Sequence, residues 1–322
     1  MKGSYSVLVR NRRIQYKFTI ERNITILKGD SATGKTTLIE MIAEYNSRGE
    51  DSGITLLCDR PCVVLNSLNW KLILENTYNS IVFIDEGDVF VKSDEFAELV
   101  KRSDNYFVIA TRAKLSNLPY SVMEVYGIKN TAGNKYQGTK RLYSEFYPIY
   151  SNHIPQIEKP DCIIVEDSNS GYEFFSSVCA LNNIACIHAG GNANVEAMVA
   201  SCNYNRILVI VDGAAFGPYI ERLLDMSLVK QLGIYLPESF EWLILKSNLL
   251  NDADIQEILK APEDYIESEK YFSWERFFTA LLSEKSKNTY LAYNKRALNA
   301  VYLQNYEKRE ILKSTPLEVL SD

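Results

Sequence analysis

The sequence predicts an α/β protein with two domains and a C-terminal helical region, and three observations lead to this fold class. An apolar run at residues 24–27 passes through a glycine-rich loop into a segment of helical spacing. Two further apolar runs, at residues 81–84 and 162–165, end abruptly in acidic residues. Between residues 162 and 236, strands alternate with helical segments, which is the pattern of a buried parallel sheet. The expected domains cover residues 1–150, 151–250 and 251–322.

The composition is that of a globular protein without membrane partners. Of the 322 residues, 46% are apolar and 24% are charged, and no apolar run approaches the roughly 18 residues of a transmembrane helix. The first residues lack the apolar core of a signal peptide, so we expect a cytoplasmic location. Residues 1–150 carry 20 basic and 17 acidic residues, a net charge of +3, and residues 151–322 carry 15 and 24, a net charge of −9. This balance excludes a protein that coats nucleic acid with a basic surface, so any such contact must be local.

The six cysteines predict reduced, structural thiols and no metal cluster. Only Cys58 and Cys62 lie close together, and no second pair of cysteines or histidines has the spacing of a zinc site. Both histidines, His153 and His188, stand alone in the sequence.

The chain begins with a predicted hairpin, residues 7–9 and 14–20, and then reaches the glycine-rich loop. This loop has the spacing G-x-x-x-x-G-K-[ST] of a P-loop, which binds nucleotide phosphates. Its glycines let backbone N–H groups curl around phosphate oxygens, and the following helix presents its positive end to the same anion. Lys35 is placed to reach the β and γ phosphates, and the Thr36 hydroxyl to bind Mg²⁺. The expected nucleotide-binding residues are Gly29, Asp30, Ser31, Ala32, Thr33, Gly34, Lys35, Thr36 and Thr37.

The apolar run at residues 81–84 ends in Asp85 and Glu86, which is a Walker B pattern. Ligands of parallel sheets lie at the carboxyl ends of the strands, so both acids are expected beside the bound nucleotide. Asp85 is the expected second magnesium residue, acting through water, and Glu86 is expected to polarise the attacking water. Glu86 and Lys35 are therefore the expected catalytic residues. The alternative is a core strand that ends in a solvated acidic turn.

Residues 105–110 repeat this form and end in Thr111 and Arg112. Residues 121–129 and 139–147 then alternate as a hairpin that closes the first domain near Pro148.

Together these motifs resemble an ABC/AAA-like P-loop ATPase. The opening hairpin resembles the ABC/SMC-type ATPases, in which a small N-terminal sheet precedes the nucleotide loop. The resemblance implies binding and hydrolysis of Mg–ATP. It also makes Thr111, with Arg112 as the weaker candidate, a sensor of the γ-phosphate; an ordinary strand end is the alternative. ATP is expected rather than GTP because no guanine-specifying N-K-x-D follows the Walker B strand. The chain departs from ABC ATPases in one respect: Lys35 and Asp85 are only 50 residues apart, and no serine-glycine-glycine signature lies between them.

After a linker at residues 151–160, four predicted strands alternate with helices. The first ends in Glu166, the second is followed by Gly190 and Gly191, and the third ends in Asp212. This order resembles the TOPRIM domain of topoisomerases, DnaG-type primases and OLD-family nucleases. The resemblance covers residues 160–247 and implies a magnesium site for phosphodiester chemistry that includes Glu166 and Asp212. An unrelated flavodoxin-like domain is the alternative.

One TOPRIM residue is missing, because Ala214 stands where the family has the second aspartate of its DxD motif. A two-metal mechanism needs several carboxylates, so this change weakens the expected metal site. Asp167, Glu238 and Glu241 are the candidates to replace the lost carboxylate.

The C-terminal region is expected to be helical. Residues 274–282 are amphipathic, and residues 288–312 combine apolar positions with interleaved tyrosines and basic residues. We interpret residues 288–312 as a helix packed on the domain; stacking on single-stranded nucleic acid is the alternative.

The order ATPase then TOPRIM resembles a shortened OLD-family or anti-phage ATPase–TOPRIM protein. The expected function is an ATP- and Mg²⁺-dependent ATPase whose nucleotide state is coupled to a TOPRIM-like domain that acts on or binds nucleic acid. The alternative is a nucleotide-gated regulatory protein whose TOPRIM-like scaffold contacts a protein partner and has no nuclease activity. Oligomerisation stays open.

Overall fold

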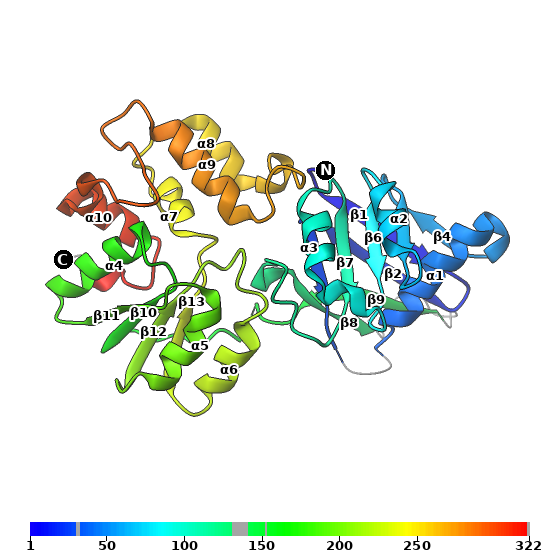
Figure 1. Ribbon diagram of the computed structural model, residues 1–322, viewed down its shortest axis with the longest axis horizontal. Helices are drawn as coiled ribbons and strands as arrows, with labels where there is room; N and C mark the ends of the chain where they lie inside the picture. Colours follow the sequence, from blue (N-terminus) through cyan, green and yellow to red (C-terminus); the bar gives the residue numbers. More distant parts are fainter. Residues whose placement is uncertain (30–32, 131–140, 152, 321–322) are drawn as a thin grey trace. The chain divides into compact units, whose positions relative to one another are not determined.

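A computed structural model of the chain describes residues 1–29, 33–130, 141–151 and 153–320, and its fold is α/β, as the sequence predicts (Figure 1). The chain divides into two units. The first contains Met1–Ser151 and Pro262–Phe272, and the second contains Asn152–Ala261 and Ser273–Asp322. Within the described residues, no helix is long and apolar enough to cross a membrane.

The first unit is built on a mixed sheet, which in its described part has the strand order β4-β1-β2-β9-β8-β3-β7-β6-β5. Its strands are β1 (Tyr5–Arg10), β2 (Ile14–Ile20), β3 (Ile24–Leu27), β4 (Thr55–Leu57), β5 (Cys62–Leu65), β6 (Ile81–Ile84), β7 (Tyr106–Ala110), β8 (Val125–Asn130) and β9 (Leu142–Pro148). Its helices are α1 (Lys35–Arg48), α2 (Trp70–Glu75) and α3 (Asp94–Lys101). The expected hairpins are present: β1 pairs antiparallel with β2, and β8 with β9.

The strands β3, β7, β6 and β5 are parallel neighbours, and this part of the sheet places the candidate site. Every residue of β3, β6 and β7 is buried, as in parallel strands of a sheet that is covered on both faces. Strand β7 lies between β3 and β6. The carboxyl ends of these three strands therefore meet at one edge.

A segment distant in sequence completes the first unit. The Met1 ammonium donates to the Ser268 hydroxyl at 2.8 Å, and the Gly3 N–H donates to the Glu263 carbonyl at 2.7 Å. The Asn23 side chain donates to the carbonyl of Phe272 at 2.9 Å. Pro262–Phe272 thus packs against the N-terminal strands through backbone-directed hydrogen bonds.

The second unit is built on a parallel sheet, which in its described part has the order β11-β10-β12-β13. Its strands are β10 (Cys162–Val165), β11 (Ala185–His188), β12 (Arg206–Ile210) and β13 (Gln231–Tyr235). Its helices are α4 (Ser170–Leu181), α5 (Asn192–Ser201), α6 (Ile220–Ser227), α7 (Phe240–Lys246), α8 (Ala253–Lys260), α9 (Trp274–Ser286) and α10 (Asn305–Leu312). Helix α4 lies on one face of the sheet and α5 and α6 on the other, as right-handed crossovers in opposite directions require (Figure 1).

The prediction of one helix over residues 288–312 is wrong. Residues 287–299 form turns, bends and irregular backbone, followed by the short 3₁₀ helix Ala300–Leu303 and by α10. Side chains supply the backbone hydrogen bonds that a helix would have made. The Ser286 hydroxyl accepts from the Tyr293 N–H at 2.9 Å, and the Asn299 amide donates to the carbonyls of Tyr290 and Ala292. Such local bonds compete with helix formation.

We expect Gly233→Ala to lower the stability of the second unit. A Cβ at this position in β13 would lie 2.9 Å from the backbone nitrogen of Ile157, whose segment is fixed by the hydrogen bond from Ile234 N–H to the Pro155 carbonyl. Overpacking of this kind costs about 1–3 kcal/mol. Urea unfolding followed by tryptophan fluorescence measures the change. Gly87→Ala is the control, because a Cβ there meets no atom within 4 Å, and equal stability of the two variants would contradict the packing argument.

Candidate functional site

The first candidate site lies where the glycine-rich loop leads into α1. Gly34 immediately precedes this helix with a φ of 96°, in the left-handed region that favours glycine. Lys35 is only 5% exposed, and its ammonium donates to the Gly29 carbonyl at 2.6 Å and to the Thr33 hydroxyl at 3.3 Å. The Lys35 side chain therefore reaches from the start of α1 back to Gly29, the first residue of the loop. Of the expected nucleotide-binding residues, Asp30, Ser31 and Ala32 lie outside the described residues.

A tyrosine that the sequence analysis did not single out supports this loop. The Tyr16 hydroxyl, from β2, donates to the Gly34 carbonyl at 3.0 Å, and a Cβ on Gly34 would lie 2.7 Å from the same hydroxyl. Burial raises the pKa of Tyr16 to about 12, so it stays a neutral donor. The alternation of β2, which places Tyr16 on the same buried face as Phe18 and Ile20, was the available signal.

The structure brings the expected magnesium residues together. Thr36, in the first turn of α1, donates from its hydroxyl to Oδ1 of Asp85 at 3.2 Å. The same carboxylate oxygen accepts from the Glu86 N–H at 2.8 Å, which fixes its direction. Asp85 directly follows β6, so a buried strand and a helix start position the two groups. Thr37 is exposed in the same turn of α1.

The two residues after β7 differ in what they can contact. Thr111 is 4% exposed, and its hydroxyl accepts from the Ala113 N–H at 3.0 Å, so it shapes the turn after the strand. Arg112 lies at the surface, and its Nε is 2.8 Å from Oε1 of Glu86. The expected water-polarising carboxylate is therefore held in an ion pair. Exposed pairs of this kind contribute only about 0–1 kcal/mol, so a ligand can open it.

The second candidate site lies at the carboxyl edge of the parallel sheet of the second unit. Glu166 directly follows β10. Asp212 follows the neighbouring strand β12, with one residue between the end of the strand and the aspartate. Gly190 and Gly191, with φ of 72° and 126°, form the turn before α5, and the Gly191 N–H donates to the Glu166 carbonyl at 3.1 Å. The two acids and the glycine pair thus meet at one edge.

Three further groups join these acids. Glu241 and Glu275 lie in the first turns of α7 and α9, where the helix dipole favours negative charge. The Lys295 ammonium is 2.7 Å from Oε1 of Glu275 and 3.7 Å from Oε1 of Glu241. Glu241 is only 2% exposed and also accepts from the Tyr293 hydroxyl at 2.8 Å. Sequence reasoning named Glu241 but missed Glu275 and Lys295, because no local pattern links them to the sheet.

The pKa values in this cluster depart from their ordinary ranges. Burial, followed by the carboxylates of Glu275 and Asp167, raises the pKa of Glu166 to about 7. Burial, followed by the surrounding carboxylates, raises the pKa of Asp212 well above its ordinary value. Burial alone would lower the pKa of Lys295, but Glu241 and Glu275 outweigh it, and the net pKa is raised. The lysine stays charged while Glu166 is partly protonated near neutral pH.

Asp167 and Glu238, the other carboxylates expected at this site, make hydrogen bonds that stabilise the surrounding backbone. Asp167 accepts from the N–H groups of Asn169 and Gly171, both at 2.9 Å, and so holds the start of α4. Glu238 accepts a hydrogen bond through its backbone carbonyl, from the Ala214 N–H at 3.3 Å. Across residues 1–29, 33–130, 141–151 and 153–320, no group of three or more His, Cys, Asp or Glu side chains is arranged to hold a metal ion.

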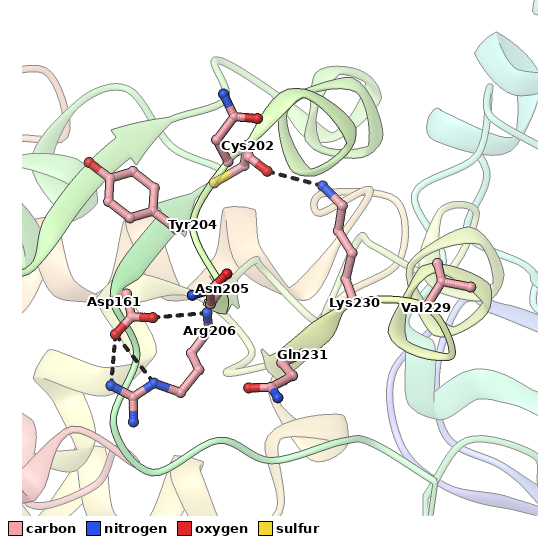
Figure 2. Close-up of a pocket in the computed structure, with 9 residues that line it drawn as sticks. Asp161, Cys202, Tyr204, Asn205, Arg206, Val229, Lys230 and Gln231 are labelled. Atoms are coloured by element: carbon pink, nitrogen blue, oxygen red, sulfur yellow. Dashed lines mark hydrogen bonds and ion pairs between the residues drawn. The ribbon is translucent and has the colours of Figure 1, made fainter.

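A cavity of about 640 Å³ lies at the opposite edge of the same sheet (Figure 2). It is lined by the first residues of β12 and β13 and by the residues just before β10, β12 and β13, including Asp161, Arg206 and Lys230. Asp161 and Arg206 pair at 2.7 Å, and the Lys230 ammonium donates to three carbonyls near the end of α5. The charged groups of this cavity thus pair with one another or bond to backbone carbonyls, at the sheet edge opposite to Glu166 and Asp212.

Comparison with models of known protein families gives no match to this chain, and comparison with curated proteins gives none either.

Glu166 should make the stability of the second unit depend on pH. A carboxyl group whose pKa is raised from 4.5 to about 7 in the fold favours the protonated state. Its contribution is fully present below pH 4.5 and is lost as the pH rises through about 7. The free energy of unfolding of the wild type should therefore fall more steeply between these values than that of Glu166→Gln. Urea unfolding at several pH values measures both slopes; parallel curves would contradict the raised pKa.

Proposed function

We propose that the first unit binds ATP and hydrolyses it with Mg²⁺. The observation that carries the proposal is the hydrogen bond from the Thr36 hydroxyl to Asp85, 49 positions away in the chain, at the point where Lys35 closes the glycine-rich loop. A phosphate chain needs backbone N–H groups, a cation and a metal held by hydroxyl and carboxylate oxygens. The residues of the motif supply these groups at one sheet edge.

The Thr36 hydroxyl and the Asp85 carboxylate are the groups that would hold Mg²⁺, and they fit it because both offer oxygen ligands. A single carboxylate is sufficient, since phosphate oxygens and water usually complete the magnesium shell in nucleotide sites. When bound, Mg²⁺ neutralises charge that develops on the β and γ phosphates. Lys35 replaces its bonds to Gly29 and Thr33 with bonds to phosphate oxygens.

Glu86 is the proposed general base, which accepts a proton from the attacking water at its carboxylate. In the structure this carboxylate pairs with Arg112 at 2.8 Å. Arg112 is therefore the residue that controls whether Glu86 is available. A partner or a nucleotide that draws the arginine away leaves the carboxylate free for the water.

For the second unit, we propose a binding role governed by the nucleotide state of the first unit rather than nuclease activity. Two observations support this choice: Ala214 replaces a carboxylate, and Lys295 carries a positive charge into the acid cluster. The nuclease alternative retains Glu166 and Asp212 at adjacent strand ends. Incubation of the protein with Mn²⁺ and single- or double-stranded DNA or RNA decides between them, because cleavage that Glu166→Ala abolishes would establish the nuclease.

Lys35→Ala should weaken ATP binding by about 10- to 100-fold, or roughly 1.4–2.8 kcal/mol, because it removes the ammonium that meets the phosphates. Isothermal titration calorimetry with ATP and Mg²⁺ measures the change. Lys101→Ala, at a half-buried position at the end of α3, is the control and should bind as the wild type does. Unchanged affinity in a folded Lys35→Ala protein would refute the nucleotide site.

Glu86→Gln should bind ATP normally but lower kcat by about 100-fold or more, because an amide cannot take up the proton. The matched control is Asp88→Asn, which neutralises another acid in the same turn, one that accepts from the Ser67 hydroxyl at 2.5 Å. Steady-state phosphate release measures both variants. If Asp88→Asn loses as much activity as Glu86→Gln, the general base is assigned to the wrong residue.

A further inference from the structure

The acid cluster of the second unit contains a cation that belongs to the chain. Residues 287–299, between α9 and the 3₁₀ helix Ala300–Leu303, bring Tyr293 and Lys295 to the carboxyl edge of the sheet. The Lys295 ammonium contacts Glu275 at 2.7 Å and Glu241 at 3.7 Å. Its charge also acts on Glu166 and Asp212, whose pKa values it pulls downward against the effects of burial and the other acids.

Several bonds hold this segment in place. The Tyr293 hydroxyl is 2.6 Å from the Ser170 hydroxyl, at the start of α4, and donates to buried Glu241. The Ser170 N–H donates to the Lys295 carbonyl at 3.4 Å, and the Leu298 N–H donates to a carboxylate oxygen of Glu173 at 3.0 Å. The segment is therefore tied to α4 on both sides of Lys295. We name residues 287–299 the lysine segment.

A divalent metal does not fit the cluster in this arrangement. An ammonium within 4 Å of two of the four acids repels a second cation strongly in a partly buried site. The position that would add a carboxylate from the strand-end turn is Ala214, which is 3% exposed and offers no ligand.

We infer that Lys295 is the resident cation of this cluster, occupying the place that a divalent metal would take, and that the carboxylates of Glu241 and Glu275 fasten the lysine segment at the sheet edge. The inference does not rest on the ATP site, because all its residues lie in the second unit. It assigns the cluster a metal-independent structural role. Removal of the lysine charge should turn it into a metal site.

The test is a Mn²⁺ titration of the full chain without nucleotide, followed by electron paramagnetic resonance. Asp85→Ala is the background, because it removes the carboxylate of the expected magnesium site in the first unit. The protein with Lys295 intact should bind no Mn²⁺ in the second unit, and Lys295→Met should gain one ion with at least tenfold higher affinity. Adding Glu166→Gln to Lys295→Met should weaken that binding again.

Lys285→Met is the matched control. Lys285 also lies between two carboxylates, Asp252 and Asp254, each at 2.8 Å, but Asp254 is largely exposed. This variant should gain no comparable site. Stoichiometric Mn²⁺ binding by the protein with Lys295, lost in Glu166→Gln, would overturn the inference, as would a folded Lys295→Met protein that gains no ion.

A measurement on the unaltered chain covers the case in which Lys295→Met does not fold. Acetic anhydride labelling followed by mass spectrometry reports how accessible each lysine amine is. Labelling of Lys295, whose ammonium pairs with Glu275, should be slower than that of exposed Lys260 at the end of α8, and unchanged by millimolar Mn²⁺. Faster labelling of Lys295 when Mn²⁺ is added would show that the metal displaces the ammonium, and the inference would fail.

Discussion

Burial on both faces is the constraint on which both units depend. A parallel strand covered by neighbours above and below must be apolar along its length, so its first polar side chains come after its last residue. In the first unit this rule places Asp85 and Thr111 at the ends of β6 and β7, beside the start of α1. In the second it places Glu166 and Asp212 at the ends of β10 and β12. The candidate functional side chains therefore lie at one edge of each sheet, where the strands end.

The two edges handle charge in opposite ways. At the first, the carboxylate of Asp85 and the ammonium of Lys35 bond to hydroxyls and backbone groups, which a charged ligand can replace. At the second, the carboxylate of Glu241 is almost fully buried and would be costly without partners, and Tyr293 and Lys295 supply them. The edge of the first sheet is therefore arranged to bind a charged ligand, whereas the charged groups at the edge of the second sheet already pair with one another.

The parts of the fold that depend on local patterns could be predicted from the sequence. The strands of both sheets, the loop before α1 and the acids after β6, β10 and β12 each produce a signal within about ten residues. Glu275 and Lys295 could not be found this way, because each reaches its site through packing between elements far apart in the chain. For Tyr16 the alternation of β2 indicates a buried position but not the contact with Gly34. Residues 288–299 were expected to be helical because their apolar spacing suits a helix, and the side-chain bonds of Ser286 and Asn299 outweigh that preference.

The segment Pro262–Phe272 has a consequence for how the protein is made. Because it belongs to the first unit, the chain passes between the units after residues 151, 261 and 272. During synthesis, Glu263, Ser268 and Phe272, which hydrogen-bond with residues at the N-terminus, leave the ribosome only after the sheet of the second unit has emerged. These hydrogen bonds therefore form only after most of the chain has been made, and a fragment ending at residue 151 lacks the segment Pro262–Phe272 of its own unit.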